Sequence, residues 1–248
     1  MRNTSKIKKG KRKKREKRVM RKLVKSCVMV LCFAVAVIIS ASVSLLAKPK
    51  VVEVKEDYST TFEGKGGKID VAAYVSRLYL VGDSAAYSKI NKALKKLSNS
   101  YSPDNIYSYA QSDTEQNDAA KRSDTYHDTV DAVCTYLGKK YISVALCSNW
   151  YAGGVSNTGV AGYVFNLKTG KRAYITKVSG KSLDYIKERL IANIHADGEF
   201  EDFDFEPVIK DRAEKDFSFY INEDGLCVVT FAPYELGWGG WTREYVIE

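Results

Sequence analysis

One run of apolar residues stands apart from the hydrophobic and polar pattern of the rest of the chain. Residues 26–47 are 22 consecutive residues without a charge, bounded by Lys25 and Lys48. A helix of that length spans roughly 30 Å, the thickness of the hydrocarbon core of a bilayer. Because the bilayer holds no water to bond a free backbone, a lone apolar segment crosses it only as a helix. The pattern predicts one transmembrane helix over 26–47.

The charges on either side of this run predict its orientation. Residues 1–25 contain 14 Lys or Arg and one acid, Glu16, for a net charge of +13. Subtracting this from the +9 of the whole chain leaves −4 for the residues that follow. Basic residues beside a span stay in the cytoplasm, so the N-terminus is expected inside and the bulk of the chain outside. A cleaved signal peptide is the alternative, but its apolar core is usually only 7–15 residues long, which favours an uncleaved anchor in the cell membrane.

The basic tail, residues 1–25, permits two interpretations of its own. On charge alone it is typical of a segment that binds nucleic acid or anionic lipid. Directly before a span, it is expected to fix the topology and to lie against the inner headgroups. No nucleic acid is therefore expected as a partner.

The polar segment after the span is expected to be a juxtamembrane linker. It covers residues 48–68, with Pro49 early and three glycines late, and only 51–54 could pair as a strand. Residues 69–248 remain for a folded extracytoplasmic domain. A domain of that size buries about 70% of its unfolded surface, which suffices for a core.

Two periodicities alternate within residues 69–248. Helical spacing predicts one helix that starts at a cap on Asp83 or Ser84 and stops within 99–104, and a second over 182–196 with Ser182 as its cap. Residues 104–124 are polar and are expected to form a surface loop or a weak strand. Strands are predicted at 69–81, 129–136, 141–151, 159–167, 172–176, 217–221, 226–231 and 244–247. Hairpins with two principal helices indicate an α+β fold with a mainly antiparallel sheet.

Catalytic and metal-binding patterns are scarce. His127 and His195 are the two histidines of the chain, and neither belongs to a spacing that brings two ligands to one metal. The sequence contains neither a nucleophile elbow nor a glycine loop of the type that holds phosphate. We therefore expect no metal, no cofactor and no enzymatic activity.

An acidic stretch, EFEDFDFEP, permits a structural and a functional interpretation. Asp202, Asp204 and Glu206 alternate with phenylalanines, which predicts an edge strand with one acidic face. A calcium loop would need a glycine where Pro207 stands. The functional alternative is a negative face for a cationic partner.

Aromatic residues next to glycines form a second candidate site. Trp and Tyr beside flexible glycines supply a large contact area at low entropic cost, so they are favoured in binding surfaces, and their rings can also stack on sugars. Core packing is the alternative explanation. The candidate ligand-binding residues are Trp150, Tyr151, Gly153, Gly154, Asn157, Tyr234, Trp238 and Trp241.

Three cysteines follow the span: Cys134, Cys147 and Cys227. An odd number cannot pair completely within one chain, and their strand positions favour free, buried thiols. A bridge between Cys134 and Cys147 across the predicted hairpin is the alternative.

Several motifs carry a resemblance to a known family. They are IDVAAYVSRLYLVGD before the first helix, the NLKTGK turn after a Gly-Gly hairpin, and the final segment that begins INEDGL. In this order they resemble the outer domain of RsiV-like anti-sigma factors, which also accompanies some peptidoglycan deacetylases. The resemblance covers about residues 69–248 and implies a ligand-binding domain, with lysozyme as the ligand in the anti-sigma members.

The chain departs from that family at two places. The family's loop often reads Gly-Gly-Ala-His, whereas here Gly153 and Gly154 are followed by Val155, Ser156 and Asn157. Anti-sigma members also need a cytoplasmic segment that binds a sigma factor, and the basic tail offers no amphipathic helix for this. A sigma factor is therefore not expected as a partner.

Together these observations predict a membrane-anchored extracytoplasmic module that binds or senses a cell-envelope ligand, either a lysozyme-like protein or a peptidoglycan fragment. An envelope glycan hydrolase or deacetylase is one alternative, although the sequence shows no catalytic site for it. A non-catalytic partner subunit of another membrane protein is the other.

Overall fold

The computed structural model describes residues 49–99, 101–116, 122–198, 203–237 and 239–248. The predicted basic tail and transmembrane helix lie outside these residues. Among the described helices, none is long and apolar enough to cross a membrane. Pro49–Glu248 form one compact unit.

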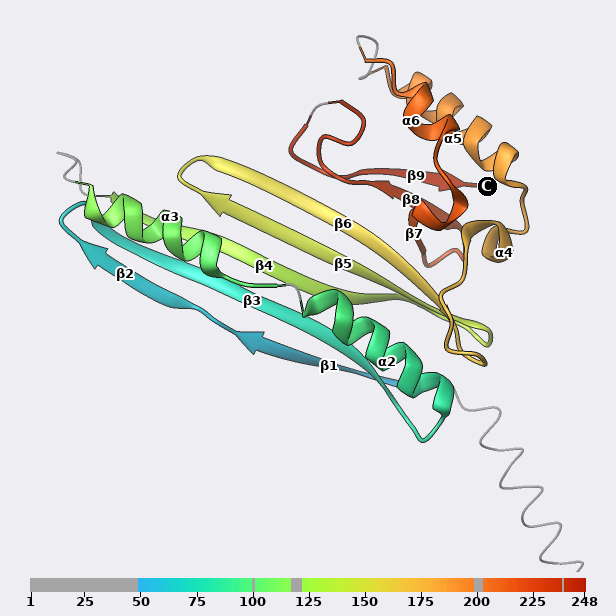
Figure 1. Ribbon diagram of the computed structural model, residues 1–248, viewed down its shortest axis with the longest axis horizontal. Coiled ribbons are helices and arrows are strands. Elements are labelled where there is room, and N and C mark those ends of the chain that lie inside the picture. The colour runs from blue at the N-terminus through green and yellow to red at the C-terminus, as the bar shows by residue number, and fades with distance from the viewer. Residues whose placement is uncertain (1–48, 100, 117–121, 199–202, 238) are drawn as a thin grey trace, which may run out of the picture. The chain divides into compact units, whose positions relative to one another are not determined.

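A long six-stranded sheet forms the first part of this unit (Figure 1). Its order is β1-β3-β4-β5-β6, and β2 also pairs with β3. All neighbours are antiparallel except β3 and β4, which are parallel, so the chain crosses over between them through α2 and α3. The bounds are β1 Lys50–Asp57, β2 Thr60–Gly64, β3 Gly67–Val81, α2 Ala85–Ser98, α3 Asp104–Glu115, β4 Arg122–Leu137, β5 Tyr141–Ala152 and β6 Val155–Asn166.

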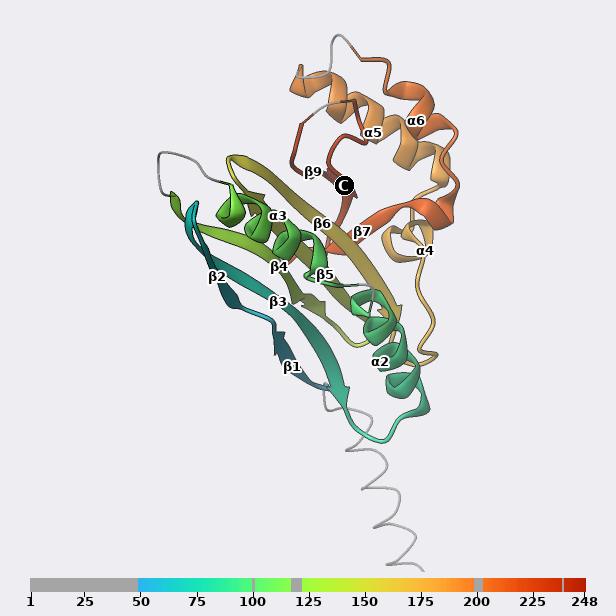
Figure 2. The same ribbon diagram turned by 60° about the vertical axis from the view of Figure 1, so that its left-hand side comes forward.

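Helices α2 and α3 lie one after the other along one face of this sheet, α3 toward the end with the β5–β6 turn and α2 toward the opposite end (Figures 1 and 2). Each buries a stripe of residues four apart: Ile90 and Leu94 of α2, and Ile106 and Ala110 of α3, all at most 4% exposed. The predicted cap of α2 is confirmed, because the Ser84 hydroxyl accepts a hydrogen bond from the Ala86 N–H at 3.2 Å. The sheet is therefore covered on one face by helices, as amphipathic periodicity requires.

Two predictions for the first part of the unit were wrong. Residues 104–115 form helix α3, where a surface loop or weak strand was expected, because the stripe of Ile106, Ala110 and Thr114 is too short to stand out in so polar a segment. The fold thus has three long helices among the described residues instead of two. Residues 50–57 and 60–64 form β1 and β2, where a linker was expected, since β3 is long enough to pair with both.

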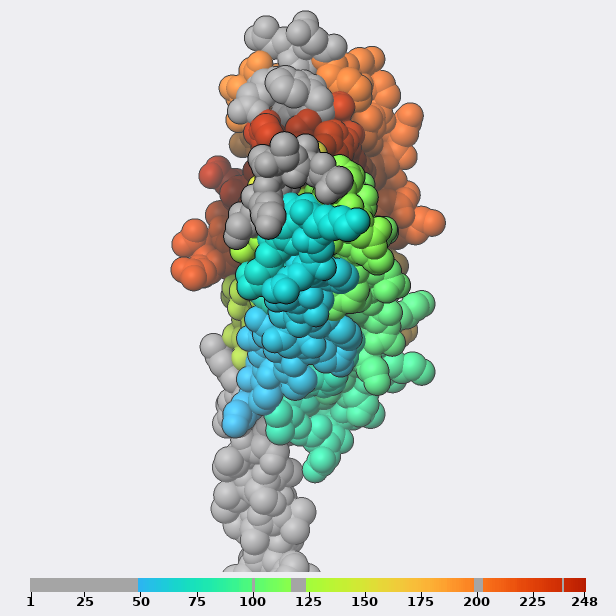
Figure 3. Space-filling model, turned by 90° about the vertical axis from the view of Figure 1, so that its left-hand side faces the viewer, coloured from blue at the N-terminus to red at the C-terminus, as the bar shows by residue number. Residues whose placement is uncertain are grey.

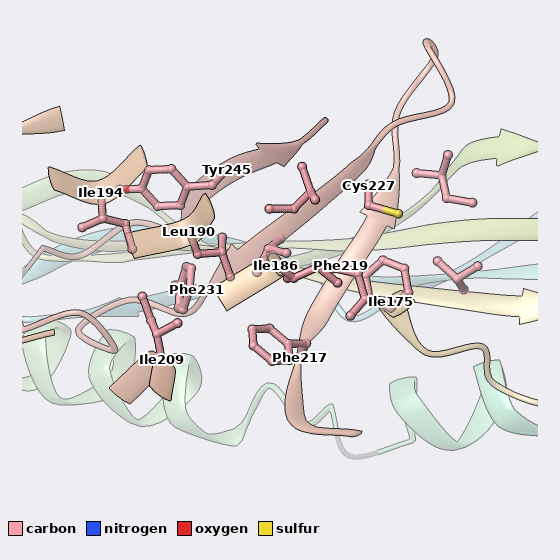
Figure 4. Close-up of a cluster of buried hydrophobic side chains, with 14 of the residues drawn as sticks. Ile175, Ile186, Leu190, Ile194, Ile209, Phe217, Phe219, Cys227, Phe231 and Tyr245 are labelled. Carbon is pink, nitrogen blue, oxygen red and sulfur yellow. The ribbon is translucent and has the colours of Figure 1, made fainter. Parts of the chain in front are cut away.

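The C-terminal part of the unit builds a second, smaller sheet in the order β7-β8-β9. Helices α5 and α6 lie beside it, and a cluster of buried aromatic and aliphatic side chains fills the space between them (Figure 4). Ile186, Leu190 and Ile194 of α5 are 0% exposed, which confirms the predicted apolar face of this helix. The bounds are α4 Ile175–Ser179, α5 Leu183–Asp197, α6 Glu206–Lys210, η1 Glu214–Asp216, β7 Ser218–Ile221, β8 Cys227–Phe231 and β9 Arg243–Ile247.

Most of the sequence-based elements in this part agree with the structure, but a strand predicted before α4 does not. The final hairpin, the edge strand β9 and the Ser182 cap of α5 are confirmed, the last by a 3.2 Å hydrogen bond from the Tyr185 N–H. The strand predicted at 172–176 is wrong. Only Arg172 makes a bridge, to Phe165, and the chain then enters α4, where Ile175 is fully buried.

The outer edge of β6 joins the two parts of the unit. At every second residue from 158 to 166, the outward-facing backbone group of β6 bonds to a later segment. The pairs are Thr158 N–H with Gly240 O, Val160 N–H with Thr242 Oγ1, Gly162 N–H with Ser218 Oγ, Val164 O with the Ala173 N–H, and Asn166 N–H with Lys171 O, at 2.7–2.9 Å. This edge is therefore closed to further strands. The opposite edge, β1 and β2, lies at the surface (Figure 3), where charged side chains discourage pairing.

The three cysteines in the described part of the chain are free, as predicted. Cys134 stands opposite Val144 and Cys147 opposite Asp131, so the hairpin register keeps the two thiols apart. Burial raises the pKa of the Cys227 thiol to about 11. The thiols are therefore protonated at neutral pH and act as small apolar side chains.

Candidate functional site

The β5–β6 turn marks one end of the six-stranded sheet, here called the tip. Gly153 and Gly154 have φ of 57° and 93°, which a two-residue hairpin turn of this type requires. Lys50, the first residue of β1, pairs with Val81 at the other end of the sheet, here called the base. The chain therefore enters the unit at the base, about the length of β3 away from the tip.

Three polar and aromatic residues form a row across the tip half of the sheet. Asp128 of β4 lies opposite Trp150 of β5, which in turn lies opposite Asn157 of β6. Residues directly opposite one another project from the same face. This is the face that carries the helices, because the Trp150 ring packs edge-on against Tyr109 of α3, with 5.5 Å between the ring centroids.

Asn157 holds a buried acceptor without a partner. Its Oδ1 makes no hydrogen bond with any described residue. Gly240 lies directly beside it, because a methyl group on Gly240 would stand 3.0 Å from Oδ1. The same methyl would stand 3.5 Å from the Tyr234 hydroxyl, which places that phenol near the row. A buried carbonyl oxygen left unpaired costs roughly 1–3 kcal/mol, so the position is unfavourable unless something bonds it.

Tyr234 and Trp241 belong to the loop between β8 and β9 and reach solvent. They are 58% and 49% exposed. Trp241 forms a parallel bridge with Thr158, next to Asn157, and the Arg243 guanidinium lies 5.1 Å from its ring centre. We call the set Tyr109, Asp128, Trp150, Asn157, Tyr234 and Trp241 the tip surface. Exposed aromatic rings beside an amide and a carboxylate suit a sugar ring or a protein partner.

Tyr234 is the one described residue other than glycine with a positive φ, 66°. This conformation costs a residue with a Cβ roughly 1–2 kcal/mol. We expect Tyr234→Gly to be more stable than Tyr234→Ala by about 1 kcal/mol, because only glycine removes the strain while both remove the ring. Chemical denaturation of the two variants checks this. Equal stabilities would show that the backbone here is unstrained.

Asp128 carries a carboxylate at a cost to stability. Burial raises the pKa of Asp128, and no described residue gives its carboxylate a hydrogen bond or an ion pair. A raised pKa means that the folded state resists ionisation of the Asp128 carboxyl. The free energy of unfolding therefore falls as the pH rises from 3.8, the ordinary pKa of an aspartate, to the raised pKa of the folded state. A charge retained under such conditions is typical of a functional site.

The substitution Asp128→Asn tests whether the ionised carboxylate lowers the stability of the fold. The variant should unfold at higher denaturant concentration than the wild type at pH 7, and the difference should vanish below pH 3.8, where both side chains are neutral. Asp70 is the control, because hydrogen bonds from Thr61 and Lys68 lower its pKa, so Asp70→Asn should give no gain. A destabilised Asp128→Asn at pH 7 would show that the carboxylate has a favourable partner.

The structure brings together only some of the predicted binding residues. Trp150, Asn157, Tyr234 and Trp241 meet at the tip surface, and Gly153 and Gly154 supply the turn beside it. Tyr151 is directed elsewhere: its hydroxyl donates to Asp124 at 3.3 Å, and its ring lies 6.2 Å from those of Tyr126 and His127. Trp238 lies outside the described residues. Sequence reasoning missed Tyr109 because α3 was not recognised, and it missed Asp128 because this residue lies just before the strand predicted at 129–136.

The predicted acidic edge strand is wrong for its described residues. Residues 206–210 form helix α6 instead, with Pro207 in its first turn, and Phe205 is buried. Glu206 bonds the His195 Nε2 at 3.0 Å and the Lys210 ammonium, and these contacts lower the pKa of Glu206. Asp204 is exposed, and Asp202 lies outside the described residues. Binding of a cationic partner here stays a prediction, although Glu206 is already paired.

The two histidines occupy the positions expected of structural residues. His127 is half-buried beside Tyr151, and His195 is exposed near the C-terminus of α5. In the described ranges, no three His, Cys, Asp or Glu side chains lie close enough to hold one metal ion.

Comparison with known proteins gives structural neighbours only. No family model and no curated protein matches the sequence. A solved DUF3298 family structure from Bacteroides fragilis is similar, with a TM-score of 0.49 and 11% identity over 81% of this chain and 91% of that one. A DUF3298 family protein from Pseudomonas aeruginosa gives the same TM-score and identity over 82% and 92%. No family is assigned on these values, and the resemblance to RsiV-like outer domains remains a prediction.

Proposed function

We propose that this protein is a membrane-anchored extracytoplasmic module whose tip surface binds a cell-envelope ligand, either a lysozyme-like protein or a peptidoglycan fragment. The observation that carries the proposal is the row of Asp128, Trp150 and Asn157 beside the exposed rings of Tyr234 and Trp241. The unpaired buried acceptor of Asn157 and the half-buried carboxylate of Asp128 both cost stability, and a bound ligand with hydrogen-bond donors would offset that cost.

The position of the tip surface supports the same function. The predicted span ends at residue 47, and β1 begins at Lys50 at the base, so the tip is the end of the sheet farther along the chain from the predicted anchor. A binding surface there suits a domain that meets envelope components. Exposed rings in one place supply binding area at low entropic cost.

Calorimetric titration of the full-length chain in detergent tests the proposal, with lysozyme and a soluble peptidoglycan fragment as separate ligands. We expect one of them to bind, and Tyr109→Ala or Trp241→Ala to weaken it by at least about tenfold, because truncation of one central aromatic costs about 2 kcal/mol. The control is Tyr174→Ala, since Tyr174 is 46% exposed and lies just before α4. Equal weakening by the control, or no binding of either ligand by a folded chain, would contradict the proposal.

A further inference from the structure

The base of the sheet carries a cluster of exposed lysines. They come from four segments: the start of β1, the first turns of α2, the β4–β5 turn and the turn after β6. The residues, here called the base lysines, are Lys50, Lys89, Lys139, Lys140, Lys168 and Lys171. The six lysines and Asp83, the single acid in the turns 82–84, 138–140 and 167–171, sum to +5. The β7–β8 turn also approaches this end, because the Ile221 N–H donates to Ser143 Oγ at 2.8 Å, and its Glu223 and Asp224 reduce the net charge to about +3.

Backbone contacts hold three of these segments together. The Leu167 N–H donates to Lys140 O at 2.9 Å, which joins the turn after β6 to the β4–β5 turn. Gly170 packs on α2 so closely that a methyl group there would stand 2.5 Å from Ala86 O and 2.8 Å from the Lys89 Cβ. The charge cluster is therefore a fixed feature of the fold, although the lysine side chains themselves reach solvent.

None of the base lysines forms an ion pair with another residue that the structure describes. The Lys140 ammonium lies 4.9 Å from the centre of the Tyr141 ring, and the others extend from exposed positions. The tip has the opposite charge balance. Its segments 63–70, 113–116 and 124–128 contain six acids and two lysines: Glu63, Asp70, Asp113, Glu115, Asp124, Asp128, Lys65 and Lys68. The unit is thus polarised along the sheet.

Chain connectivity limits how far the start of β1 can lie from the end of the predicted span. Lys50 follows Ala47, the last residue of the predicted span, by three residues, which reach at most about 11 Å even when extended. The electric field of an anionic leaflet acts over about 8–10 Å at physiological salt. The start of β1 therefore cannot move far from the headgroups if the anchor is in the bilayer.

We propose that the base lysines dock on the anionic lipid headgroups of the bilayer that holds the anchor, so that the tip surface points away from the membrane. This inference rests on the membrane anchor of the proposed function. Lysine ammonium groups are flexible point charges, which suits a fluid layer of phosphate groups. The fifteen residues of β3 then place the tip roughly 50 Å from the base.

Hydrogen exchange of the full-length chain in lipid nanodiscs tests this docking. Discs of phosphatidylcholine are compared with discs that also contain phosphatidylglycerol. We expect amides of 137–141 and 167–171 to exchange at least about threefold more slowly in the anionic discs, with no change at 153–157. Molar salt should abolish the difference, because it shortens the range of the field to about 3 Å.

Two matched charge reversals locate the effect. Lys168→Glu/Lys171→Glu should remove the lipid-dependent protection, whereas Lys65→Glu/Lys68→Glu, which alters the charge equally at the tip, should retain it. Identical exchange in both kinds of disc would overturn the docking. Equal protection of the base by soluble polyphosphate in phosphatidylcholine discs would also overturn it, because the occupant would then be a free polyanion. A chain that does not co-elute with the discs would contradict the predicted membrane anchor. The ligand titration described above tests binding at the tip surface independently of this result.

Discussion

Gly162→Ala is expected to lower the free energy of unfolding by about 3 kcal/mol or more. A methyl group at Gly162 would stand 2.1 Å from the Phe219 carbonyl carbon and 2.5 Å from the Tyr220 nitrogen. Both are backbone atoms of β7 and cannot move aside alone, so the two sheets would have to separate. That movement would also break the 2.9 Å hydrogen bond from the Gly162 N–H to Ser218 Oγ.

Gly159→Ala is the matched control in the same strand. Its added methyl would meet only the Ser148 hydroxyl, an exposed side chain that can rotate away. Alanine also loses less conformational entropy than glycine in a strand, so the change should stay below about 1 kcal/mol. Urea unfolding of both variants checks the pair. Similar losses for both would show that β6 and β7 are not in close contact at Gly162.

Arg212→Met is expected to cost about 2–3 kcal/mol. The Arg212 side chain is 9% exposed and pairs with Glu235, and its guanidinium carbon lies 5.5 and 5.0 Å from the ring centres of Phe217 and Phe231. Removal of one partner leaves the other charge partly buried and unpaired. Glu235 also accepts the Ala232 N–H at 2.6 Å, so it fixes the start of the loop that carries Tyr234.

A double-mutant cycle separates charge from packing at this pair. Arg212→Met/Glu235→Gln should recover at least about 1 kcal/mol relative to Arg212→Met, because glutamine still accepts the Ala232 N–H but leaves no charge behind. Thermal or urea unfolding of the four proteins gives the coupling. Strictly additive losses would show that the two charges do not interact.

Strongly periodic elements could be predicted from the sequence, and weakly periodic ones could not. The apolar faces of 85–98 and 182–196, their serine caps and the strand hairpins are all confirmed. Helix α3 was missed because two fully buried residues, Ile106 and Ala110, anchor an otherwise polar segment. Strands β1 and β2 were missed because edge strands carry charges that are typical of linkers.

The candidate site could likewise be predicted only in part. Composition alone identified the aromatic loops, since Trp and Tyr beside glycines are frequent at binding surfaces. Which of them meet depends on strand register: Trp150 faces Asn157, whereas Tyr151, the next residue, contacts His127 and Asp124. A shift of one residue reverses the face of every side chain, and single-sequence patterns do not define the register that closely.

The measurement that tests the central claim most directly is a hydrogen-exchange footprint of the full-length chain with a bound envelope ligand. At saturation with lysozyme or a peptidoglycan fragment, amides of 149–158 and 239–242 should become protected, while those of α5 and β1 stay unchanged. Protection confined to α5, α6 or the base, with the tip unaffected, would contradict the assignment of the tip surface as the binding site.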